Sequence, residues 1–95
     1  MKKLRKLLVE MIKAYLNNEK LPKGVVATDS MDAEPDERVE IYFSSKQRSV
    51  TVLAITMAVD VKIIQVYSEF PANLRVLFSE LFKFFGFDVI ELTKV

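Results

Sequence analysis

Histidine and cysteine are both absent from this chain of 95 residues, and their absence limits the chemistry that it can perform. Without them there is no thiolate nucleophile, and the commonest general base and the commonest transition-metal ligands are missing. The groups that remain for catalysis or metal binding are carboxylates, lysines, serines and tyrosines. The serines have no base partner, so a serine nucleophile is not expected.

Acidic side chains are concentrated in one segment, residues 29–37. Their oxygens are ligands of the kind that Ca²⁺ and Mg²⁺ prefer: Asp29, Asp32, Glu34, Asp36 and Glu37. The segment has neither the spacing nor the glycine of a calcium-binding loop. We therefore expect a solvated loop, and we expect the chain to hold no metal and no cofactor.

Basic side chains gather in two places, near the N-terminus and in the polar segment 44–49: Lys2, Lys3, Arg5, Lys6, Lys46 and Arg48. Together they would contact a phosphate backbone if they shared one surface. The net charge is only +1, which gives no general attraction to nucleic acid. Solubility is therefore the favoured role of these charges, and nucleic-acid binding is the alternative.

The elements that must position these groups follow from apolar periodicity. A helix is predicted over residues 2–17, with one apolar stripe at helical spacing: Leu4, Leu7, Leu8, Met11, Ile12 and Tyr15. A second helix is predicted over 71–85, between Pro71 and Gly86. Alternating or β-branched segments predict strands over residues 25–28, 39–43, 50–57, 61–67 and 87–92.

The resulting order, α-(β)-β-β-β-α-β, predicts a single α+β domain over residues 1–95. Short connections between the middle strands favour a two-layer structure with a mostly antiparallel sheet and two helices. No apolar run approaches the ~18 residues that span a bilayer, and no signal-peptide pattern opens the chain. We therefore expect a cytoplasmic protein that does not bind membranes.

The element order and two short motifs resemble the core of the PD-(D/E)xK nucleases. The motif Pro35-Asp36 precedes Asp60-Val61-Lys62, and the resemblance implies that Asp36 and Asp60 hold Mg²⁺ while Lys62 orients the attacking water. In element order alone, the chain is also similar to small dimeric chaperones of secretion systems, which have no catalytic residues. The segment 50–57 carries no acid, which favours a non-enzymatic domain over the nuclease alternative.

The middle strands are apolar on both faces, and this pattern predicts a homodimer. Strict alternation divides segment 50–57 into two apolar sets, Val50, Val52 and Ala54 against Leu53, Ile55 and Met57. Two helices on one side would leave the other face bare, and a second copy would cover it. The alternative is a complete monomer with one helix on each face.

The expected interface residues are Leu53, Ile55, Met57, Ile64 and Val66, with Phe82 and Phe84 of the second helix as an alternative contact. The favoured function is a small non-enzymatic interaction module, an adaptor or chaperone-like homodimer with an unidentified protein partner. A Mg²⁺-dependent nuclease and a nucleic-acid-binding accessory protein are the alternatives.

Overall fold

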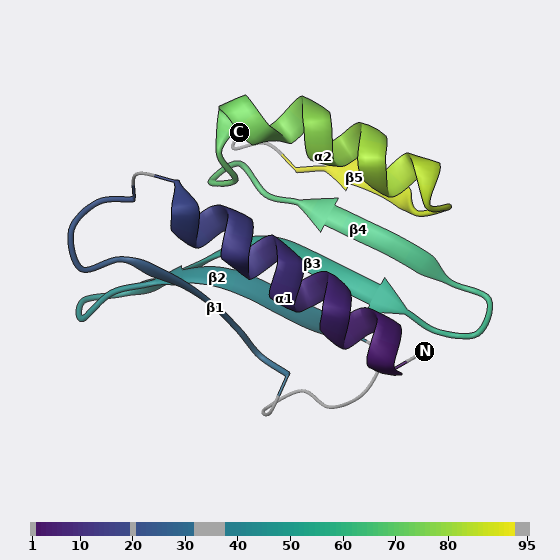
Figure 1. Cartoon of the computed structure of the whole chain (residues 1–95), viewed down its shortest axis with the longest axis horizontal. Coiled ribbons are helices and arrows are strands. Elements are labelled where there is room, and N and C mark those ends of the chain that lie inside the picture. The colour runs from purple at the N-terminus through teal and green to yellow at the C-terminus, as the bar shows by residue number, and fades with distance from the viewer. Residues whose placement is uncertain (1, 20, 32–37, 93–95) are drawn as a thin grey trace.

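A computed structural model describes residues 2–19, 21–31 and 38–92. In chain order its elements are α1 (Lys2–Asn18), β1 (Val26–Asp29), β2 (Arg38–Ser44), β3 (Ser49–Met57), β4 (Lys62–Val66), α2 (Ala72–Phe84) and β5 (Asp88–Glu91). The strands form one sheet in the order β1-β2-β3-β4-β5 (Figure 1). The predicted α+β class, the element order and the mostly antiparallel sheet are confirmed.

The strands β1 to β4 pair antiparallel, whereas β5 pairs parallel with β4. The parallel pair exists because α2 carries the chain back along the sheet before β5 begins, and such a crossover returns the chain in its original direction. Gly86, at φ +88°, makes the reversal after α2. The Gly86 N–H donates to Lys83 O and the Phe87 N–H donates to Phe82 O, each at 3.0 Å, which is the Schellman pattern of a helix end.

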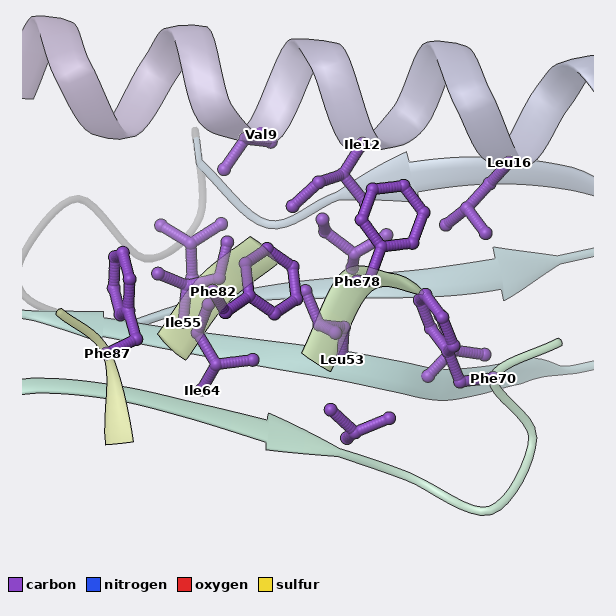
Figure 2. Packing of buried hydrophobic residues seen from close by; sticks show 14 of the residues in the cluster. Val9, Ile12, Leu16, Leu53, Ile55, Ile64, Phe70, Phe78, Phe82 and Phe87 are labelled. Carbon is purple, nitrogen blue, oxygen red and sulfur yellow. The ribbon is translucent and has the colours of Figure 1, made fainter. Parts of the chain in front are cut away.

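Both helices cover the same face of the sheet, and the core lies between them and the strands (Figure 2). The three α1 side chains Val9, Ile12 and Leu16 point down onto this face and are fully buried. From α2, Phe78 and Phe82 stack with their ring centroids 5.7 Å apart. These two rings of α2 therefore lie within the core, where large rings bury the most area per residue.

A bulge in β3 changes which of its side chains share a face. Ile41 pairs with Leu53, whereas Phe43 pairs with Val50, so β3 has one residue more than β2 across this stretch. Because Ile41 and Phe43 lie on the same face of β2, their partners Leu53 and Val50 also share a face. Val52, inside the bulge, is fully buried in the same core. The predicted separation of Leu53 from Val50 and Val52 is therefore wrong.

Neither of the helices that the structure describes covers the opposite face of the sheet, and polar side chains dominate its centre. The Arg38 guanidinium lies 3.4 Å from the Glu40 carboxylate, and it donates to the Tyr67 hydroxyl at 3.2 Å and to Gln65 Oε1 at 3.5 Å. Ala54, which pairs with both Glu40 and Gln65, is small and lies buried between them. The sheet therefore does not present the bare apolar face from which a homodimer was predicted.

Candidate functional site

The residues of the nuclease resemblance occupy different environments. Asp60 is exposed in the turn between β3 and β4. Lys62 begins β4, where its Nζ lies 3.4 Å from the carbonyl oxygen of Phe85 and 5.5 Å from the centroid of the Phe87 ring. Asp36 lies outside the described residues. Within residues 2–19, 21–31 and 38–92, no group of three potential metal-ligating acids is present.

Of the acidic segment, Asp29 is the residue that the structure describes; Asp32, Glu34, Asp36 and Glu37 lie outside the described residues. Asp29 ends β1, forms an ion pair with Lys13 of α1 and accepts a hydrogen bond from the Met31 N–H at 2.9 Å. Its carboxylate therefore ties the first helix to the edge strand of the sheet.

This ion pair shifts the pKa of both partners. The hydrogen bond to Asp29 raises the pKa of Lys13 above its ordinary value of 10.5. Partial burial acts in the opposite direction and lowers this pKa, but Glu10, 3.0 Å away, also raises it. For Asp29, burial alone raises the pKa, but the hydrogen bonds from Lys13 and from the Met31 N–H outweigh it. The pKa of Asp29 therefore lies below its ordinary value of 3.8.

The two basic groups lie at opposite ends of the molecule. Lys46 and Arg48 are exposed in the connection between β2 and β3, whereas Lys3 and Lys6 are exposed on the first turns of α1 (Figure 1). Arg5, predicted to belong with them, is buried instead. The basic side chains therefore do not form one continuous phosphate-binding surface across the described residues.

Six of the seven predicted interface residues belong to the core of a single chain. Leu53, Ile55, Met57, Ile64, Val66 and Phe82 are each 5% exposed or less. Both helices cover the sheet face on which these side chains lie, so a partner would contact them only if the core opened. The exception is Phe84, which is 81% exposed.

Large apolar side chains are instead exposed on the helical layer. The side of α1 that packs against the sheet carries Val9, Ile12 and Leu16, whereas much of the predicted stripe lies outside the core. Leu4, Leu7, Met11 and Tyr15 are 54%, 68%, 38% and 52% exposed. These four residues of the stripe are exposed because the apolar arc of α1 is wider than the strip that the sheet can cover.

The two helices run antiparallel (Figure 1). A groove lies between them where α1 begins and α2 ends, since residues from both of these ends line it. The helices touch where the last part of α1 meets the middle of α2, with the Tyr15 and Phe78 ring centroids 5.6 Å apart. The groove has a volume of about 410 Å³, and its lining consists of Leu4, Leu7, Leu8, Met11, Lys62, Leu81, Phe85 and Phe87. Lys62 is the one charged residue in this lining.

The aromatic residues at the end of α2 indicate, from the sequence alone, that some large apolar side chains must lie outside the core. Phe82, Phe84 and Phe85 fall within four consecutive positions, and successive helical side chains point about 100° apart. They therefore cannot all enter one core, and Phe82 is the one that does. The position of α1 relative to α2 depends on tertiary packing, so the groove itself has no such signal.

Comparison of the chain with protein-family models, with curated proteins and with solved structures gives no match. Neither α1 nor α2 combines the length and the apolar composition needed to cross a membrane.

Proposed function

We propose that this chain is a non-enzymatic protein-interaction module that works as a homodimer, with the exposed side of the helical layer as its interface. The observation that carries this proposal is a set of seven exposed side chains, here called the helical apolar surface: Leu4, Leu7, Met11, Tyr15, Leu77, Phe84 and Phe85. Their exposed fractions run from 38% for Met11 to 81% for Phe84.

The size of this surface favours an interface. A fully exposed side chain of this kind presents on the order of 200 Å², so the seven together expose roughly 800 Å². The largest apolar patch on a typical monomer is about 300–600 Å². A standard protein–protein interface buries about 800 Å² per partner. The helical apolar surface is therefore larger than monomers usually leave exposed and sufficient for a stable complex.

The charges around this surface favour a second copy over a strongly charged partner. On α1, the exposed charged side chains include Lys3, Lys6 and Glu10. On α2 they include Glu80 and Lys83. A two-fold interface has to be complementary to itself, and a rim with both signs of charge meets this condition.

Light scattering of the eluting protein, with matched charge substitutions, tests the proposal. Leu7→Glu places a carboxylate within the helical apolar surface, whereas Val59→Glu places one at a position that is 91% exposed in the turn between β3 and β4. We expect the unmodified chain and Val59→Glu to have twice the mass of 10.9 kDa, and Leu7→Glu to have the monomer mass. Monomer mass for all three proteins would contradict the proposal.

A further inference from the structure

We propose that Phe84 of each copy inserts into the groove between α1 and α2 of the other copy, so that two reciprocal aromatic insertions anchor the dimer. This inference rests on the homodimer proposed above and names the contact that holds it together. Three observations carry it: the exposure of the Phe84 ring, the size and chemistry of the groove, and the position of Phe84 beside the groove on the same surface.

Phe84 is presented as a rigid, exposed ring. It lies in the last turn of α2, is 81% exposed, and packs edge-on against Phe85 with ring centroids 5.5 Å apart. The end of α2 is held by the Gly86 and Phe87 hydrogen bonds and by the Phe85 N–H, which donates to Leu81 O at 3.1 Å. A preorganised aromatic side chain loses little conformational entropy on binding, which is typical of interface anchors.

The groove has the room and the chemistry to receive a phenyl ring. An apolar cavity of about 150 Å³ accommodates benzene, and this groove has a volume of about 410 Å³. Its walls are leucines, a methionine and two phenylalanines. The Lys62 ammonium, which already lies over the Phe87 ring at 5.5 Å, offers a cation–π contact to a second ring.

Symmetry explains why the contact is made between copies. Phe84 directly precedes Phe85, which lines the groove, but Phe84 is not part of the lining, because its side chain leaves the helix about 100° away from that of Phe85. The aromatic ring and the groove are thus adjacent on one surface. A two-fold axis placed between them makes both insertions at once.

A tryptophan reporter tests the insertion directly, because the chain contains no tryptophan. In Phe84→Trp, the indole emission should shift to the blue as protein concentration rises, over the same range in which sedimentation shows dimer formation. In the control Val59→Trp, the indole is attached to an exposed turn, and its emission should not change. Phe84→Ala should raise the dimer dissociation constant roughly 30-fold or more, as expected for an anchor residue.

The outcomes separate this inference from the proposed function. A chain that remains monomeric at every concentration overturns both. A dimer that forms equally well in Phe84→Ala, with no blue shift in Phe84→Trp, leaves the proposed function in place and overturns the insertion. A blue shift that appears only when anionic lipid vesicles are added shows that the side chain at position 84 binds a lipid surface. This result also overturns the insertion.

Discussion

The side-chain amide of Asn17, in the last turn of α1, pairs with both backbone groups of Ala27 in the edge strand β1. Its Nδ2 donates to Ala27 O at 3.2 Å, and the Ala27 N–H donates to Asn17 Oδ1 at 2.8 Å. The amide thus takes the place of a neighbouring strand on the outer side of β1. It attaches α1 to the sheet and blocks an edge that would otherwise be open to strand pairing.

Asn17→Ala should lower the free energy of unfolding by about 1–3 kcal/mol, because it leaves the polar backbone groups of the buried Ala27 without a partner. Asn18→Ala is the matched control, since it removes an exposed amide from the adjacent position. Urea unfolding measures both variants. Equal stability of the two would show that the Asn17 amide does not hold α1 on β1.

The ion pair between Lys13 and Asp29 should make stability depend on pH at both extremes. Since the pKa of Asp29 is lowered in the folded state, its contribution is complete above pH 3.8 and is lost as pH falls through the lowered pKa. Since the pKa of Lys13 is raised, its contribution is complete below pH 10.5 and is lost as pH rises through the raised pKa.

Asp29→Asn should therefore reduce stability at neutral pH by on the order of 1 kcal/mol and flatten the loss of stability in acid. Glu10→Gln is the comparison, because the Glu10 carboxylate is 54% exposed and that of Asp29 is 13% exposed. Its effect should be a few tenths of a kcal/mol. Chemical denaturation over a series of pH values measures both, and an unchanged acid limb in Asp29→Asn would rule out the predicted linkage.

Gly86→Ala should destabilise the chain by about 1 kcal/mol, since φ +88° is a conformation that side chains with a Cβ rarely adopt. No atom lies within 4 Å of the added Cβ, so backbone strain is the whole expected cost. Gly86→Asn should lose less, because asparagine tolerates this conformation. Thermal unfolding ranks the variants, and an alanine variant as stable as the unmodified chain would refute the role of Gly86 in ending α2.

The variants Phe82→Ala and Phe84→Ala should distinguish a residue of the core from a residue of the interface. Phe82 is fully buried between α2 and the sheet, so its truncation should cost about 3–5 kcal/mol of stability at any protein concentration. Phe84→Ala should leave the monomer nearly as stable and act on association alone. Unfolding measured below and above the concentration of dimer formation tests this; a large loss in the monomer of Phe84→Ala would place Phe84 in the core.

The element order and sheet type could be predicted because they depend on local periodicity, turn residues and short connections. The faces of the strands and helices on which particular side chains lie could not be predicted, for two physical reasons. The bulge at Val52 reverses the alternation within β3, and its place depends on pairing with β2. The rotation of α1 about its axis depends on which side of a wide apolar arc meets the sheet, and this leaves Leu4 and Leu7 outside.

The same two reasons explain why most of the predicted interface residues are buried in the core. The homodimer was predicted from a bare apolar sheet face, but Leu53, Ile55 and Ile64 lie beneath the helices and are fully buried. Large apolar side chains are exposed on the helical layer instead, and Phe84 is the one predicted interface residue among them.

Sedimentation equilibrium of the unmodified chain beside Leu7→Glu, across the micromolar range, tests the central claim most directly. If the helical apolar surface is a dimer interface, the unmodified chain will pass from 10.9 kDa to twice that mass as its concentration rises, and Leu7→Glu will remain at 10.9 kDa. A mass of 10.9 kDa for the unmodified chain at every concentration would contradict the account.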